Sequence, residues 1–308
     1  MPINRIQFQP GVSMPEFFSR YGSEEQCAAA LKALRWPQGF RCPHCSTAEH
    51  YVMGHGVRTL FQCRACQHQT SLTAGTLMDS AKLPLRTWFL TIILISQDKK
   101  GLSSLALMRH LGTGYGTAWL IQHKLMIAMA QRDTEQPLDG YVQLDDAYLG
   151  GERPGSTGRD SENKVPFVAA VACDKAGHPL RIKVSPVPAF TREAIAAWAK
   201  VNLLPTCDVL SDGLGCFAGV IDADCAHTYM VVGQRKPHDL PQFKWVNTIL
   251  GNLKTMLYGA HKAFDFGRYA GHYLGAFAYR FNRRFCLPAL LQELLGHAAP
   301  TPKRQVRG

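Results

Sequence analysis

The sequence predicts an α/β protein in which a sheet with surrounding helices follows a small cysteine-containing module and a helical region. Three observations lead to this prediction. Two CxxC motifs lie in the first quarter of the chain, apolar helical patterns follow from about residue 85 to 132, and strand patterns then alternate with helical ones. With 308 residues, the chain is long enough for about two domains plus a small module.

The charge and composition of the sequence indicate the kind of partner and the cellular compartment. A formal net charge of +11 favours a polyanionic partner, because Lys and Arg neutralise phosphates and release counterions. The most apolar run, residues 87–96, is shorter than the roughly 18 residues of a membrane span. The first 14 residues show no signal-peptide core. We therefore expect a cytoplasmic protein with no membrane partner, where paired cysteines indicate metal rather than disulfides.

The two CxxC motifs predict a zinc ribbon. Seventeen residues separate the pairs, and the four predicted zinc ligands are Cys42, Cys45, Cys63 and Cys66. Zinc takes four such thiolates in a tetrahedron, and this leaves no open position for chemistry, so the ion is expected to be structural. The intervening residues 46–62 alternate as in a β-hairpin.

Helical patterns flank this module on both sides. A helix is predicted to start at Ser23 and to end before Pro37, and residues 84–96 predict a largely buried helix. Residues 102–112 and 114–132 then predict two helices joined by a glycine-containing turn.

That last pair matches the helix-turn-helix pattern, which favours DNA binding, although helical hairpins that bind nothing look the same. The polar positions that face phosphates or bases on this interpretation are His110, Thr117, His123 and Lys124.

The second half of the chain reads as three strands, then helix, strand, helix, strand and helix. The predicted strands are residues 141–151, 164–173, 178–187, 207–212 and 226–232. The predicted helices are residues 191–204, 213–222 and 242–264. The first of these helices has Thr191 as its N-cap.

Four polar residues on these elements predict a divalent-metal site. Asp145 lies on the first strand, Asp212 ends the fourth, and Asn247 stands near the start of the last helix. Lys254 follows Asn247 by seven residues, which is two turns and therefore the same face. Carboxylate and carbonyl oxygens are the ligands that magnesium prefers.

Each of the four also has a simpler interpretation. Asp146 adjoins Asp145, and strand alternation lets only one of the two point at a metal. Asp212 with the following glycine is a common turn, Asn247 is a good helix N-cap, and Lys254 alone is an ordinary surface lysine. Rivals to Asn247 as the third ligand are Asn252 and Asp239.

Several segments together resemble the ISXO2-like insertion-sequence transposases of the IS1595 group. They are CPHC…CRAC, DDAYLGGERPG, LSDGLGCF, WVNTILGNLKTMLYGAHKAF and YLGAFAYRFNRRF, which together span about residues 17 to 285. The resemblance implies a ribonuclease-H-like catalytic domain with a mixed five-stranded sheet and helices, and the element order read above agrees with it. It also implies the metal set Asp145, Asp212 and Asn247, followed by Lys254.

The resemblance implies the chemistry as well. Two magnesium (or manganese) ions activate water or a 3′ hydroxyl, with Asp145 bridging both ions, Asp212 on one and Asn247 on the other. Lys254 contacts a phosphate. The expected reaction is 3′-end cleavage at terminal inverted repeats, followed by strand transfer into target DNA. The expected partners are double-stranded DNA and further copies of the chain, at the nucleoid. Alternatives are a metal-dependent nuclease that does not join strands, and an inactive DNA-binding regulator.

These expectations divide the chain into five segments. They are an N-terminal helical segment at 1–38, the zinc ribbon at 39–80, the helix-turn-helix-like region at 81–136, the catalytic domain at 137–290 and a basic tail at 291–308. Within AYRFNRRF, the arginines either contact phosphate or pack against the core through their stems. The glycine- and serine-rich residues 150–164 are expected to form a mobile element or an exposed hairpin.

Overall fold

The computed structural model describes residues 9–55, 58–150, 164–231, 233, 235, 239–262 and 264–296. Residues 297–308 of the expected basic tail and residues 151–163 lie outside this part of the chain, and Leu290–Gly296 form a helix, α9. The chain divides into two compact units. The sheet unit comprises residues 99–103 and 129–285, and the helical unit comprises residues 10–98, 104–128 and 286–296. Within the described ranges, no helix has the length and apolar character needed to cross a membrane.

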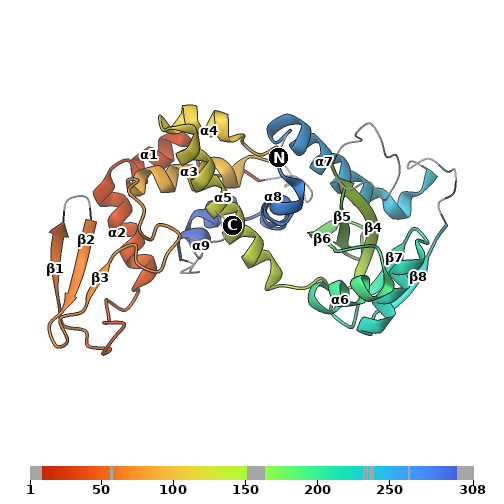
Figure 1. The fold of residues 1–308 in the computed structure, drawn as a ribbon, viewed down its shortest axis with the longest axis horizontal. Coiled ribbons are helices and arrows are strands. Elements are labelled where there is room, and N and C mark those ends of the chain that lie inside the picture. The colour runs from red at the N-terminus through yellow and green to blue at the C-terminus, as the bar shows by residue number, and fades with distance from the viewer. Residues whose placement is uncertain are drawn as a thin grey trace. The chain divides into compact units, whose positions relative to one another are not determined.

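The helical unit holds the cysteine module and a group of helices (Figure 1). Its elements are α1 (Met14–Tyr21), α2 (Glu24–Arg35), β1 (His50–His55), β2 (Arg58–Cys63), β3 (Gln69–Ser71), α3 (Leu85–Gln97), α4 (Ser104–Leu111), most of α5 (Tyr115–Thr134), η4 (Leu287–Ala289) and α9 (Leu290–Gly296). The three strands form an antiparallel sheet in the order β1-β2-β3. The predicted hairpin is therefore present, with its turn residues 56–57 outside the described ranges.

Residues at the start of α2 cap both α2 itself and the N-terminus of α3. Ser23 and Gln26 form a capping box, which confirms the helix start predicted at Ser23. The next residue, Glu24, accepts hydrogen bonds from the backbone N–H groups of Leu85 and Arg86. A carboxylate at this position satisfies orphan donors and complements the dipole of α3, whose own N-cap is a proline.

The predicted pair of helices is present as α4 and α5, and two of its four polar candidates point into the protein. His123 is 1% exposed and stacks on Trp119, with ring centroids 4.0 Å apart. The Lys124 ammonium donates to the Leu77 carbonyl oxygen. These two side chains are therefore engaged in the interior of the helical unit, whereas His110 is exposed and Thr117 is half-buried.

The sheet unit contains the remaining elements. They are the end of α5, β4 (Tyr141–Leu149), β5 (Val165–Cys173), β6 (Pro179–Pro186), α6 (Arg192–Asn202), β7 (Asp208–Ser211), η1 (Gly215–Ala223), β8 (Ala226–Tyr229), η3 (Pro241–Phe243), α7 (Lys244–Ala260) and α8 (Phe266–Asn282). The five-stranded sheet has the order β6-β5-β4-β7-β8. Its first three strands are antiparallel, and β4, β7 and β8 are parallel. The mixed five-stranded sheet was expected from the family resemblance and the element order through α7 was predicted, whereas α8 was not.

Helices cover both faces of this sheet (Figure 1). One core packs α6 and η1 against alternate residues of β4 such as Val142 and Leu144. The other core packs α7 and α8 against the opposite face, with Leu253 of α7 and Leu274 of α8 fully buried. Because strand residues alternate between faces, Gln143 and Asp145 of β4 belong to the α7 side.

The basic motif AYRFNRRF, residues 278–285 at the end of α8, covers the sheet edge formed by β6. Asn282 accepts from the Ile182 N–H and donates to the Ile182 carbonyl, so its side-chain amide pairs with β6 as another strand would. The Arg284 guanidinium is fully buried and donates to the carbonyls of Leu180 and Pro179. Burial lowers the pKa of Arg284 to about 10. These bonds occupy polar groups that an edge strand otherwise offers to another chain.

A buried ion pair between Asp133 and Lys183 lies next to Asn282. Asp133, at the end of α5, is 4% exposed and Lys183 of β6 is 3% exposed, with their charged atoms 3.3 Å apart. Asn282 donates to Asp133 at 2.7 Å. The Arg283 guanidinium stacks 3.8 Å from the Tyr279 ring centroid. Of the two sequence interpretations for these arginines, packing against the core holds for Arg283 and Arg284.

Asn282 is therefore predicted to be a stability determinant. Asn282→Ala leaves Asp133 and the Ile182 backbone short of partners, and we expect a loss of about 2–3 kcal/mol in the free energy of unfolding. Urea titration of the full chain measures it. The exposed amide variant Gln242→Ala is the control, and equal midpoints for the two variants would contradict the role of Asn282.

Candidate active site and zinc module

The two predicted carboxylates meet because of strand pairing. β4 and β7 run parallel, and their last paired residues are Leu144 and Ser211. Asp145 and Asp212 are the next residues on each strand, so they lie side by side at the end of this ladder. Gly213 follows with φ +93°, a left-handed turn whose Cβ position lies 3.3 Å from Val231. The chain thus turns away directly after Asp212, and the Asp212 carboxylate accepts from the Leu214 N–H at 3.1 Å.

Asp145 has an unusual environment for a carboxyl group. Burial raises its pKa to about 7, and the charges of Asp212 and Asp146 add to the rise. The Asp146 N–H, which donates to it at 2.9 Å, and the charge of Lys254 act in the opposite direction. A carboxyl group held this way favours whatever neutralises it, either a proton or a cation.

Asp146 also belongs to the cluster. Asp145, Asp146 and Asp212 each offer a carboxylate oxygen within 4.8 Å of the others. Strand alternation alone would separate the two adjacent aspartates, but a carboxylate oxygen of each lies close to the other here. Pairing with β7 stops at Leu144, so Asp145 and Asp146 stand where β4 has a neighbour on the β5 side only.

The side chain of Gln143 anchors α7 beside the carboxylates. It is 4% exposed, two residues before Asp145, and its oxygen accepts from the N–H groups of Trp245 and Val246. Gln143 thus satisfies donors in the first turn of α7, where the N-cap residue makes no side-chain bond. Asn247 is the fourth residue of this helix, so it does not take the N-cap position that its sequence also allowed.

Three of the remaining candidates lie on α7, and Asp239 precedes this helix. Lys254 is exposed, and its charge acts on Asp145. Asn247 shares its side of the helix. Asn252 lines a separate pocket with residues of α8. Asp239 is exposed and lies outside the three-carboxylate cluster.

The donor set fits a hard divalent cation. Magnesium prefers carboxylate and carbonyl oxygens and is usually held by one or two carboxylates plus water and phosphate. The three clustered carboxylates supply such oxygens at the end of β7, and no nitrogen or sulfur ligand belongs to this cluster of described residues. The site is therefore suited to magnesium or manganese rather than to zinc.

The cysteine quartet suits zinc. Ligand atoms of Cys42, Cys45, Cys63 and Cys66 lie within 4.8 Å of one another. The Cys42–Cys66 sulfurs are 3.6 Å apart and the Cys45–Cys63 sulfurs 3.4 Å apart. Sulfurs about 2.3 Å from a tetrahedral zinc lie roughly 3.8 Å from each other, which is close to these values. The described residues around β1–β3 thus hold a structural zinc site.

Comparisons with known proteins match the two parts of the chain that contain these clusters. Residues 137–282 match the ISXO2-like transposase domain, and residues 22–69 match the transposase zinc-ribbon domain. A 144-residue stretch is 26% identical to a protein of Halobacterium salinarum described as an uncharacterized protein in transposable element ISH50. That stretch covers 46% of this chain and 46% of the relative, so the match spans about half of each protein.

Zinc removal is predicted to unfold the cysteine module. Cys63→Ser should lower the bound zinc from one equivalent per chain and expose the hairpin, because the ion contributes folding energy to a module with a small core. Metal analysis and limited proteolysis measure the two effects. Cys286→Ser, an exposed cysteine outside the cluster, serves as the control. Full zinc content in Cys63→Ser would contradict the assignment.

The raised pKa of Asp145 predicts a pH dependence of stability. The folded-state pKa of about 7 exceeds the ordinary value of 3.8, so the folded protein holds the proton more tightly than the unfolded chain. The contribution of Asp145 to the free energy of unfolding is therefore fully present below the unfolded-state pKa, and it is lost as pH rises towards the folded-state pKa. Asp145→Asn removes this loss.

Without added divalent metal, the melting temperature of Asp145→Asn should exceed that of the wild type by a margin that widens from about pH 5 to about pH 8. Thermal melts of the exposed variant Asp208→Asn give the control. A margin that does not change with pH would refute the raised pKa.

Proposed function

Because the chain belongs to the ISXO2-like insertion-sequence transposases, we propose that it cleaves DNA at the ends of its element and joins them to target DNA. The observation that carries this proposal is the adjacency of Asp145 and Asp212 at the end of the β4–β7 ladder. Their domain is the one that matches the transposase domain. The net charge of +11 supports a DNA partner.

Cleavage and joining are the same chemical step with different nucleophiles. In the first, a water oxygen attacks phosphorus, the bond from phosphorus to the 3′ oxygen breaks, and that oxygen leaves as a free 3′ hydroxyl. In the second, this hydroxyl attacks a target phosphodiester and displaces the target's own 3′ oxygen. Divalent ions supply activation of the attacking oxygen and stabilisation of the leaving one when bound.

The residues of the chain hold and orient the reactants. We assign Asp145 and Asp212 as the carboxylate ligands and Asn247 as a neutral carbonyl ligand from α7. A neutral ligand would hold an ion less firmly than a carboxylate would, so a bound ion would rely more on DNA phosphate. Lys254, on the same side of α7, holds a phosphate of the substrate. The exposed His110 of α4 and the half-buried Thr117 of α5 are candidate DNA contacts, and bringing two ends together requires at least two copies of the chain.

The carboxylates can be tested on a duplex carrying the inverted repeat that flanks this reading frame. Asp145→Asn and Asp212→Asn should each reduce magnesium-dependent 3′-end release more than about a hundredfold, since even partners of metal ligands are worth 10–100-fold. Gel analysis of cleavage and strand-transfer products measures both steps. Retained strand transfer in either variant would overturn the assignment. Cleavage without joining would indicate a nuclease, and DNA binding without cleavage would indicate a regulator.

The third ligand can be tested separately. Asn247→Ala should raise the magnesium concentration needed for half-maximal cleavage, while Asn247→Glu keeps an oxygen ligand and should need less metal than Asn247→Ala. Asp239→Ala should behave as wild type. A magnesium titration of the cleavage rate compares the three, and a defect confined to Asp239→Ala would move the third ligand to that residue.

A further inference from the structure

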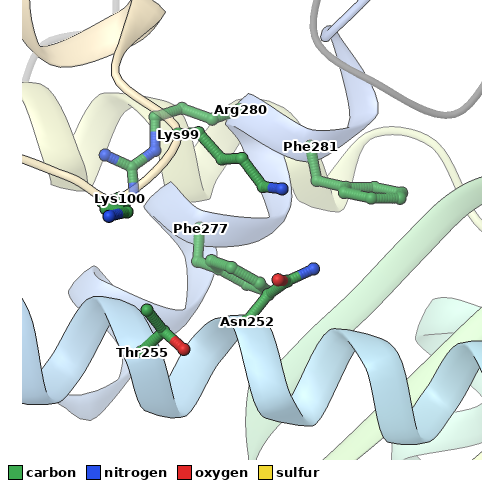
Figure 2. Close-up of a pocket in the computed structure, with 7 residues that line it drawn as sticks. All are labelled: Lys99, Lys100, Asn252, Thr255, Phe277, Arg280 and Phe281. Atoms are coloured by element: carbon green, nitrogen blue, oxygen red, sulfur yellow. The ribbon is translucent and has the colours of Figure 1, made fainter. Parts of the chain in front are cut away.

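A basic pocket lies within the sheet unit beside α7. It has a volume of about 110 Å³. Its lining residues are Lys99, Lys100, Asn252, Thr255, Phe277, Arg280 and Phe281. Figure 2 shows Asn252 and Thr255 on α7, three side chains on α8, and the two lysines on the segment that precedes Gly101. Because a single water needs only roughly 10–15 Å³, the pocket has room for a group of several heavy atoms.

The charge of this pocket has one sign. Lys99 and Lys100 are exposed, whereas Arg280 is only 4% exposed. Among the described residues that line the pocket, none is an aspartate or glutamate. Arg280 donates from Nη2 to the thioether sulfur of Met256 at 3.0 Å, and a thioether is a weak acceptor. The planar fork of donors of a guanidinium matches an anion with several oxygens, such as a phosphate.

The neutral lining complements that charge. Asn252 is half-buried and brings an amide with two donor hydrogens. Thr255 is exposed at the rim, and its hydroxyl bonds to the Gly251 carbonyl. Phe277 and Phe281 are at least 90% buried, so they form an apolar wall rather than a free stacking surface. Several donors around an apolar wall fit a phosphate group better than a nucleobase, whose edge needs acceptors as well.

The lysine segment is held close to Arg280 by a glycine. Gly101 is buried with φ +78°, which other residues rarely adopt. A Cβ there would lie 3.2 Å from His261 Nε2 and 3.3 Å from Arg280 Nη1. The close backbone approach therefore requires glycine, and it places Lys99 and Lys100 at the pocket.

We propose that this pocket binds one backbone phosphate of DNA. Asn252 and Lys254 lie two residues apart on α7, roughly 200° around the helix, so they point to nearly opposite sides. Lys254 acts on Asp145, so the phosphate in the pocket is distinct from the one that reacts. The pocket thus anchors DNA on the flank of α7 away from the carboxylates. The identity of the ligand as DNA rests on the proposed function.

The test is the salt dependence of duplex binding by the full chain without added magnesium. Fluorescence anisotropy gives the dissociation constant between about 50 and 200 mM salt, and each lost phosphate contact lowers the log–log slope by about 0.9. Lys99→Ala removes a cation, and Thr255→Glu places a carboxylate at the rim. Both should lower the slope by about that amount and weaken binding several-fold.

Two matched controls separate the pocket from general charge effects. Thr248→Glu is exposed on the same side of α7, and its hydroxyl bonds to the carbonyl four residues back, as that of Thr255 does. Lys175→Ala removes an exposed lysine in the turn between β5 and β6. Both should keep the wild-type slope apart from a small uniform shift.

Three outcomes decide the proposal. A slope change in Lys99→Ala and Thr255→Glu but not in the controls supports it. Equal slopes in all four variants overturn it. Calorimetric binding of inorganic phosphate that Thr255→Glu abolishes, with an unchanged DNA slope, overturns the DNA assignment and leaves a small-anion site. Because the binding assay needs no cleavage, a chain that shows the pocket-dependent slope but neither cleaves nor joins its element ends in magnesium would refute the proposed function and leave the pocket proposal standing.

Discussion

The parallel pairing of β4 with β7 is the constraint on which the candidate site depends. It ends at Leu144 and Ser211, and the next residue of each strand is an aspartate. Two carboxylates placed this way are held by backbone hydrogen bonds rather than by side-chain contacts. Burial of Asp145 and the charges of Asp212 and Asp146 raise the pKa of Asp145, and the two packed cores of the sheet supply stability that offsets this cost.

The helix α7 connects this pair to the rest of the unit. Gln143 fixes its first turn to β4, and Leu253 buries its apolar face in the core shared with α8. The two polar sides of α7 contribute to different candidate sites. Asn247 and Lys254 lie on one side of α7, and the charge of Lys254 acts on Asp145. Asn252 lies on another side, where it lines the basic pocket. One helix therefore faces two sites with no side chain in common.

The basic motif at the end of α8 shows how burial changes the meaning of a charge. Arg284 binds carbonyls of β6, and Arg283 stacks on Tyr279 next to the Asp133 ion pair. These arginines close a sheet edge, and burying them is tolerated because carbonyls and Asp133 lie within reach. Arg280 differs, because it lines a pocket with two lysines and no acidic side chain among the described lining residues.

The sequence by itself determined the α/β class, the order of strands and helices, the cysteine quartet, and the placement of Asp145 and Asp212 at strand positions. Periodicity, ligand spacing and family resemblance are local or linear properties, so they can be read from the chain. Only the tertiary structure decided that Asp146 joins the carboxylates and that His123 is buried. It also decided which arginines are structural. Those outcomes depend on where one strand stops pairing and on which side chains another element covers, and neither is encoded in the spacing of residues along the chain.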